Sequence, residues 1–363
     1  MQLQEVRTLT KVVKILKKLT TYQLFLPITA LIIVLVVNVI KTPAFFDVSI
    51  KNGVLYGYII DVINRGSELV ILAVGMTLVV AASGGTDISV GAVCSMAGAI
   101  SCFILSGGEH SVNEFQNPYS LAIMAALVMG VLCGAWNGFL VAKLKIQPMV
   151  ATLILFTAGR GIAQLITEGQ ITYIRVEQYK YLGGSIQGVP IPTSIFVAII
   201  VVVITLVLLK KTALGLYIQT VGINSKAARL VGLNAVKIKF LTYTICGLMA
   251  GIAGLIISSR VYSSDANNAG LNLELDAILA VALGGNSLGG GKFSLIGSVI
   301  GAYTIQALTT TLYAMSVSAD QLPVYKAIVV ILIVSLQSPE LSKFRKKIAA
   351  KLNTRKSERK VAE

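Results

Sequence analysis

The sequence predicts an all-α membrane protein, a polytopic bundle of about ten transmembrane helices with one short extra helix outside the membrane. Of the 363 residues, 55% are hydrophobic and only 13% are charged, which is roughly half the charged fraction of a soluble domain. Apolar runs close to the ~20 residues that cross a hydrocarbon core recur along the chain. Basic residues gather at the ends of these runs and in the tails, which is the positive-inside pattern of membrane proteins.

The apolar runs divide the chain into three regions. Residues 1–23 are basic and expected to be cytoplasmic, 24–338 form the membrane domain, and 339–363 form a basic cytoplasmic tail. Spans are expected at 24–40, 67–82, 88–105, 119–142, from 148 onward, and at 194–209, 240–258, 277–283, 293–313 and 323–337. An even number of spans places both termini on one side, and the segments assigned to that side hold most of the Lys and Arg residues.

The connections between spans are expected to be short and polar. An external segment should follow the first span and contain Asp47, Asp61 and Arg65. The first apolar run lacks a small-residue cleavage site, so we expect a retained span rather than a removed signal peptide.

Composition and residue placement exclude several functional classes. The net charge is +15, but the basic residues lie at span ends and in the tails, so we expect contact with membrane lipid and not with nucleic acid. The four cysteines fall inside predicted spans without paired spacing, which indicates packing residues. His110 is the single histidine. We therefore expect no metal site and no catalytic cluster.

Glycines spaced four apart indicate closely packed helices. The pattern occurs at Gly130/Gly134/Gly138, Gly247/Gly251 and Gly297/Gly301. Such glycines let helix backbones approach closely, and they indicate a packed bundle rather than a substrate.

A polar segment at 210–239 interrupts the apolar pattern. It has no acidic residue and carries six basic ones, Lys210, Lys211, Lys226, Arg229, Lys237 and Lys239. Asn224 and Ser225 can cap a short helix, Gly232 can end it, and its expected face is Ala227, Ala228 and Val231. About eight helical residues make a rod of about 12 Å, too short to span a membrane but long enough to dock in a groove of a soluble partner. The alternative is a solvated basic loop that only sets topology.

Two glycine-interrupted blocks suggest an internal duplication. Residues 71–93 and 278–302 both open with Ile-Leu-Ala-Val and continue to Gly-Gly pairs, although chance similarity is an alternative. The second block does not form a phosphate loop, because Asn286 stands at the required first glycine and Phe293 replaces the magnesium-binding Ser or Thr. We expect no cofactor in this chain, so any ATP and magnesium would be bound by a separate subunit.

Charged residues within or beside the spans are the candidate functional residues. Asp87 follows a glycine break, where it either serves the pathway or caps the next helix. Arg160 lies near the middle of its span and must face the protein interior or an aqueous path, with Gln164 on the same face. A salt bridge from Arg160 to Asp87 or Glu274 is as good an explanation as substrate contact.

The most polar external patch is expected in the segment 259–276. Its members are Asp265, Asn267, Asn268, Glu274 and Asp276. Carboxylate and amide groups suit hydroxyl-rich ligands, because together they donate and accept hydrogen bonds. They equally suit the docking of an external protein, or a solvated loop.

Three motifs resemble those of a known transporter family. GMTLVVAASGGTDISVGAV (75–93) is similar to its GGIDLSVG motif, GINSKAARLVGLN (222–234) to its coupling segment, and LAVALGGNSLGGGKFSLIGSVIGA (279–302) to its second glycine-rich block. From about residue 60 to 338 the chain resembles the permease subunits of bacterial sugar ABC importers of the ribose/xylose/arabinose type. Residues 145–171 and 263–281 are most similar to galactofuranose importer permeases.

This resemblance implies both a function and a set of partners. The chain would be the transmembrane permease subunit of an ATP-driven importer, not an enzyme, and would form the pathway for a monosaccharide such as galactofuranose. It would lie in the bacterial inner membrane with a second permease subunit, usually a different chain, two ATP-binding subunits and an external sugar-binding protein. The residues of the implied coupling helix are Gly222, Ile223, Asn224, Ala227, Ala228 and Gly232. The alternative is an ion-coupled secondary sugar transporter, which would need carboxylates inside its spans.

Overall fold

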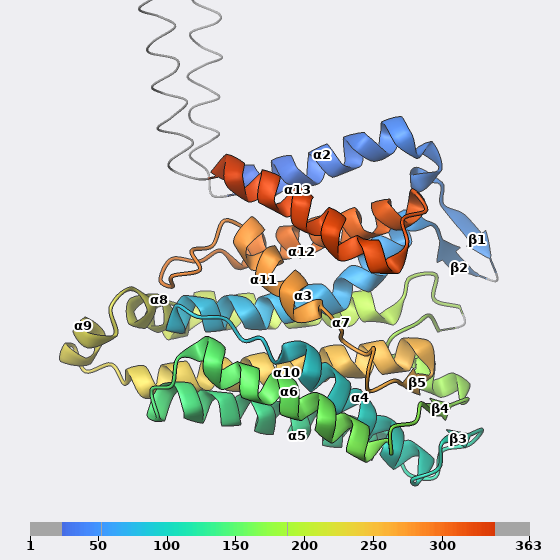
Figure 1. Cartoon of the computed structure of the whole chain (residues 1–363), viewed down its shortest axis with the longest axis horizontal. Helices are drawn as coiled ribbons and strands as arrows, with labels where there is room; N and C mark the ends of the chain where they lie inside the picture. The colour runs from blue at the N-terminus through green and yellow to red at the C-terminus, as the bar shows by residue number, and fades with distance from the viewer. Residues whose placement is uncertain (1–23, 52, 187, 338–363) are drawn as a thin grey trace, which may run out of the picture.

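A computed structural model describes residues 24–337, except 52 and 187. The predicted basic N-terminus (1–23) and basic tail (339–363) lie outside these described residues. The fold is an elongated helical bundle in which most long helices run along the long axis (Figure 1).

The helices and strands follow each other in a simple order. The helices are α2 (Phe25–Lys41), η1 (Pro43–Phe46), α3 (Tyr58–Ser83), α4 (Val90–Ser106), α5 (Tyr119–Gly138), η2 (Phe139–Lys143), α6 (Pro148–Ile166), η3 (Glu177–Tyr181), α7 (Thr193–Lys211), α8 (Leu214–Ile223), α9 (Ser225–Leu230), α10 (Ala235–Val261), α11 (Leu273–Leu283), α12 (Leu295–Ala314), η4 (Ala319–Gln321) and α13 (Leu322–Gln337). The strands are β1 (Ser49–Lys51), β2 (Val54–Tyr56), β3 (Ser111–Val112), β4 (Thr172–Ile174) and β5 (Ser263–Ser264).

Every apolar segment predicted to be a span is helical, but not every one is long enough to cross a membrane. Among the described residues, six helical segments have the length and hydropathy of a span: Tyr58–Ser83, Tyr119–Lys143, Pro148–Ile166, Thr193–Lys211, Ala235–Val261 and Leu295–Ala314. Other apolar helices are shorter, and α11 has only 11 residues. At about 1.5 Å per residue, α11 covers about half of a hydrocarbon core. The all-α membrane fold is therefore supported, whereas the count of ten is not.

α3 is the central helix of the bundle. Its residues from Gly66 to Ala82 are all buried, and it packs against α7, α8, α10, α11 and α12. The expected packing through spaced glycines is present between α5 and α10, where a Cβ added to Gly130 would clash with the carbonyl oxygen of Gly247 and one added to Gly134 with that of Tyr243. These glycines bring the two helix backbones into direct contact.

The first external segment is shorter than predicted. Asp61 and Arg65 lie inside α3, which begins at Tyr58 rather than near residue 67. The prediction is wrong because the helix extends beyond the apolar run: Asp61 and Arg65 are exposed on its first turns, and burial begins only at Gly66.

Two small sheets lie at one end of the bundle (Figure 1). β1 and β2 form an antiparallel pair, with Ser49 opposite Tyr56. A second sheet has the order β3-β4-β5, in which β3 and β4 are parallel and β4 and β5 antiparallel. It joins the segments that follow α4, α6 and α10. We call the end of the bundle that carries both sheets the sheet end. The helix α9 protrudes at the opposite end, which we call the α9 end.

Candidate functional site

α9 is a short helix that extends beyond the bundle at the α9 end (Figure 1). The side chain of Asn224 caps it by accepting hydrogen bonds from the backbone N–H groups of Lys226 and Ala227, both at 3.0 Å. The chain turns at Gly232 with φ of +83°, a conformation that favours glycine. The predicted cap and stop are confirmed, although the helix has six residues rather than about eight.

The predicted face of this helix is wrong. Ala228 is fully buried against Val221 and Ala235, whereas Ala227 is exposed and Val231 is 72% exposed. Neighbouring residues point about 100° apart on a helix, so Ala227 and Ala228 cannot face the same way once one of them packs inward. Val231 lies beyond the last helical residue, Leu230.

The exposed large apolar side chains lie instead at the two ends of α9, one just before the helix and two where it ends. Ile223 is 64% exposed, Leu230 89% and Val231 72%. Large exposed apolar side chains beside basic residues are typical of a protein-docking surface. In the sequence, the apolar Leu-Val pair next to Gly232 was the only sign of this surface. The face expected from the small residues did not include it as a whole.

Gly222 lies where three segments of the chain meet, which we call the Gly222 junction. A Cβ at this position would clash with the carbonyl oxygen of Ala81, at the end of α3, and would crowd the N–H of Gly291. That N–H donates to the Ala81 carbonyl at 2.9 Å, and Gly290 packs against Gly84. The end of α8, the break after α3 and the loop between α11 and α12 are therefore in direct contact. The two similar glycine-rich blocks meet at this junction.

Asp87 lies in the protein core and not on the surface of the bundle. It is 1% exposed and accepts hydrogen bonds from the N–H of Ser89 (3.0 Å), the hydroxyl of Ser89 (2.6 Å) and the amide of Asn137 (3.3 Å). Ser89 immediately precedes α4. Asp87 thus holds the chain where α4 begins, as expected of a residue that fixes the break.

Arg160 and Gln164 tie α6 to the loop after β5. The Arg160 guanidinium donates to the carbonyl oxygens of Asn267 (3.1 Å) and Ala269 (3.3 Å), and Gln164 donates to the side-chain oxygen of Asn267 (2.5 Å). Both expected salt bridges, to Asp87 or Glu274, are absent from the described residues. The guanidinium instead satisfies backbone carbonyls that the loop leaves free.

The loop from 265 to 268 is organised by Asp265. This carboxylate accepts hydrogen bonds from the backbone N–H groups of Asn267 (2.9 Å) and Asn268 (3.2 Å) and from the Asn268 side chain (2.7 Å). Partial burial raises the pKa of Asp265, but these hydrogen bonds outweigh it and hold the pKa below its ordinary value.

Glu274 and Asp276 do not belong to an exposed patch. They are only 3% and 8% exposed, because α11 begins at Leu273 and carries both side chains into the bundle. Asp276 accepts from Lys326 of α13 at 2.7 Å. Within the described residues one oxygen of Glu274 has no hydrogen-bond partner, and it lies where a side chain on Gly91 would otherwise stand. The predicted external patch is therefore reduced to Asp265, Asn267 and Asn268.

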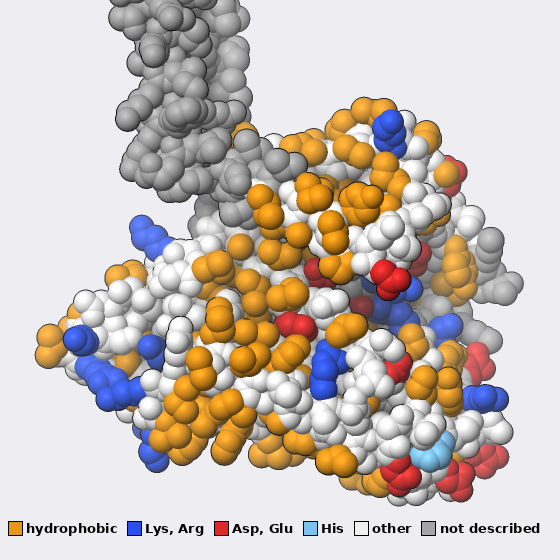
Figure 2. Space-filling model, viewed as in Figure 1, with side chains coloured by type: hydrophobic (Ala, Val, Ile, Leu, Met, Phe, Trp, Pro, Cys, Tyr) orange, Lys and Arg blue, Asp and Glu red, His pale blue; other side chains and the backbone are white. Residues whose placement is uncertain are grey.

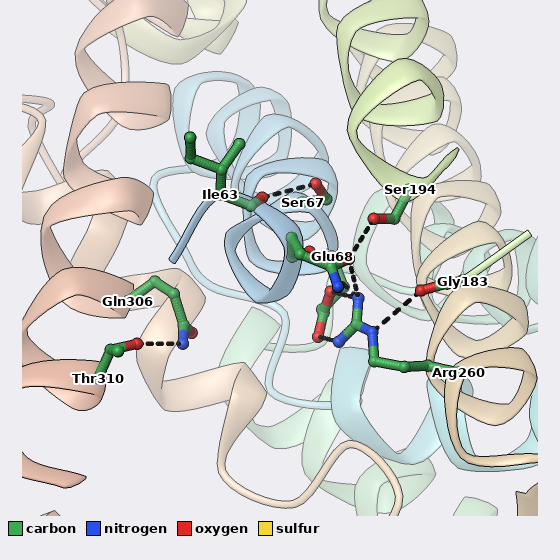
Figure 3. A network of polar contacts seen from close by, with 9 residues as sticks. Ile63, Ser67, Glu68, Gly183, Ser194, Arg260, Gln306 and Thr310 are labelled. Atoms are coloured by element: carbon green, nitrogen blue, oxygen red, sulfur yellow. Dashed lines mark hydrogen bonds and ion pairs between the residues drawn. The ribbon is translucent and has the colours of Figure 1, made fainter. Parts of the chain in front are cut away.

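A buried network that the sequence pattern did not indicate joins α3 to α10 (Figure 3). Arg260 donates to both oxygens of Glu68, each at 2.6 Å, and to the backbone oxygens of Asn64 (3.1 Å) and Gly183 (3.2 Å). Ser194 of α7 donates to the Asn64 side chain at 2.5 Å. The only sequence signal was a glutamate at the start of an apolar run, and its partner lies 192 residues away.

These features define a polytopic helical membrane protein with a short helix beyond one end of its bundle. No group of three or more potential metal ligands occurs among the residues that the structure describes. The chain belongs to the family described as branched-chain amino acid transport system / permease component, whose model matches residues 58–336.

Several curated relatives match nearly the whole chain. The galactofuranose transporter permease protein YtfT of Escherichia coli (strain K12) is 45% identical over 312 residues, covering 86% of this chain and 88% of the relative. The fructose import permease protein FruF of Bifidobacterium longum (strain NCC 2705) is 39% identical, covering 90% of each chain. The ribose import permease protein RbsC of Escherichia coli (strain K12) is 37% identical, covering 84% of this chain and 90% of the relative. The chain is therefore a multi-pass inner-membrane transport subunit and not an enzyme.

Proposed function

We propose that this chain is the permease subunit of an ATP-driven importer and forms the membrane pathway for a monosaccharide, with galactofuranose or a related sugar as the first candidate. The observation that carries the proposal is the similarity, over 84–90% of this chain, to permeases named for galactofuranose, fructose and ribose. The family description names branched-chain amino acids, but these relatives all carry sugar names. A sugar is therefore the better-supported substrate class.

Hydrolysis of ATP is assigned to separate subunits that dock on α9. Ile223 at the end of α8 and Leu230 and Val231 at the end of α9 present exposed apolar side chains that a groove on an ATP-binding subunit can enclose. Movement of α9 would reach the Gly222 junction directly, and from there the breaks after α3 and α11. ATP and magnesium would be held by those subunits, and a second permease, expected to be a different chain, would complete the pathway.

The orientation follows from the charge distribution. Figure 2 shows Lys and Arg side chains gathered at the α9 end, with no acidic side chain beside them on this face. By the positive-inside rule this end would be cytoplasmic, as would both termini. An external sugar-binding protein would then approach the sheet end, near the loop of Asp265, Asn267 and Asn268.

The test is transport by the purified assembly in proteoliposomes. We expect uptake of radiolabelled galactofuranose only when the external binding protein and internal ATP are both present. Co-purification of the tagged chain, followed by mass spectrometry, should recover an ATP-binding subunit and a second, different permease. Uptake driven by a proton or sodium gradient without ATP would instead support the ion-coupled transporter and contradict the proposal.

A further inference from the structure

A cavity of about 280 Å³ lies between α9 and the end of the bundle. Its wall combines residues from separate elements: Ser225 and Arg229 of α9, Lys239 of α10, Lys145 from the turn after η2, and Pro148 at the start of α6. The cavity thus lies where the short helix meets the membrane-spanning helices.

The lining of this cavity is strongly basic. Lys145, Arg229 and Lys239 all line it, and no acidic residue does. Within the described part of the chain, none of the three cations makes a hydrogen bond or an ion pair with a side chain. Lys239 is only partly exposed, so its charge is less well screened by water than those of the exposed lysines nearby. Three positive charges around one recess create a field that attracts an anion.

The donor groups match the oxygens of a phosphate. A guanidinium offers a planar pair of N–H donors, each ammonium offers three more, and the Gln147 amide also lines the cavity. The hydroxyls of Ser83 and Ser225 line it as well, but they donate to the carbonyls of Val79 and Val221. Lys145 is held in the left-handed region with φ of 59°, which is uncommon for a residue with a side chain. Such backbone conformations cluster at ligand-binding sites.

The surroundings of the cavity favour a lipid as the source of that phosphate. Immediately after Pro148, the side chains of Met149 and Val150 are 55% and 50% exposed, and Leu153 and Ile154 continue this apolar surface one turn further along α6. Acyl chains can lie along this surface while the headgroup enters the basic recess. We propose that the cavity binds the phosphate group of an anionic phospholipid, which bridges Arg229 of α9 to Lys145 and Lys239 and holds α9 against the bundle.

The test measures lipid retained by the complete transporter after reconstitution in nanodiscs of phosphatidylglycerol and phosphatidylcholine. The double variant Arg229→Gln/Lys239→Gln removes two cavity cations, and Lys226→Gln/Lys237→Gln removes two exposed cations of the same segment that do not line the cavity. With about fivefold in affinity for each cation, the cavity variant should retain phosphatidylglycerol about thirtyfold less tightly. The control variant should retain it as the wild type does.

A second variant guards against simple misfolding. Ser225→Glu places a carboxylate inside the cavity at the first turn of α9, where a negative charge is favourable. We expect it to elute as an intact complex, to lose phosphatidylglycerol, and to keep amide hydrogens of residues 224–234 protected from exchange without lipid.

The remaining outcomes separate the sources of the anion. Protection of residues 224–234 by inorganic phosphate, with no selective retention of phosphatidylglycerol, would keep the phosphate site but replace the lipid with a free ion. Equal lipid retention by the cavity and control variants would overturn the proposal. Protection that depends on the ATP-binding subunits alone would also overturn it, because the cations would then serve a protein contact.

Discussion

Arg260 and Glu68 carry opposite charges inside the bundle, and each buried charge is neutralised by the other. Their side chains are only 15% and 9% exposed, and both oxygens of Glu68 accept from the guanidinium. Removing one partner leaves the other charge buried and unpaired, which costs about 3–5 kcal/mol. We therefore expect Arg260→Met to lower the free energy of unfolding by about that amount, measured by denaturant titration in detergent micelles.

The double variant Glu68→Met/Arg260→Met is the matched control for this prediction. It removes both charges and retains side-chain volume, so most of the lost stability should return. A double variant as unstable as the single one would show that the hydrogen bonds to Asn64 and Gly183, rather than the charge pair, carry the effect.

Asp265 gives its loop a defined dependence on pH. Its pKa in the folded chain lies below the ordinary value of 3.8, so the carboxylate stabilises the loop at all pH above that value. This stabilisation is lost as the pH falls through the folded pKa. The protection of the Asn267 and Asn268 amides, measured relative to their intrinsic exchange rate at each pH, should therefore stay high from neutral pH to about pH 4 and fall below it. In Asp265→Asn the protection should no longer vary with pH. If the variant keeps the pH profile of the wild type, the pH dependence belongs to another group.

At the scale of the elements, the Gly222 junction should be sensitive to a single methyl group. In Gly222→Ala the new Cβ would meet the Ala81 carbonyl and disturb the hydrogen bond from Gly291. Such overpacking costs about 1–3 kcal/mol. We expect lower stability, together with ATP hydrolysis that no longer drives proportional uptake in proteoliposomes. Gly161→Ala is the control, because a Cβ on Gly161 has no neighbour within 4 Å.

The tip of α9 should determine binding of the ATP-binding subunit. Leu230→Asp puts a charge on a side chain that is 89% exposed, so the permease fold should survive while docking weakens by at least about thirtyfold, the effect of losing one major contact residue. Leu271→Asp, at a 49% exposed position in the loop beside α11, should bind normally. Pull-down with the tagged ATP-binding subunit measures both, and equal binding would exclude α9 as the docking helix.

Local pattern predicted the helices well and their contacts poorly. Long apolar runs such as that of α7 needed only composition and periodicity. The partner of Glu68 is Arg260, which is remote in the sequence, so a local window could not show this pair. Asn224 and Gly232 act on their own neighbours, and their roles at the ends of α9 were predictable. The burial of Ala228 depends on packing against Val221 and Ala235, and it was not predictable from the local sequence.

At the scale of the whole molecule, the proposed orientation can be tested by labelling introduced cysteines from one side of the membrane. The four native cysteines are buried, so background labelling should be low. Lys226→Cys marks the α9 end and Gln170→Cys the sheet end, and both positions are exposed. Because basic residues stay on the cytoplasmic side, a membrane-impermeant maleimide should label only Gln170→Cys in cells with a permeabilised outer membrane, and both variants after lysis. Labelling of Lys226→Cys before lysis would reverse the orientation and move the ATP-binding subunits away from α9.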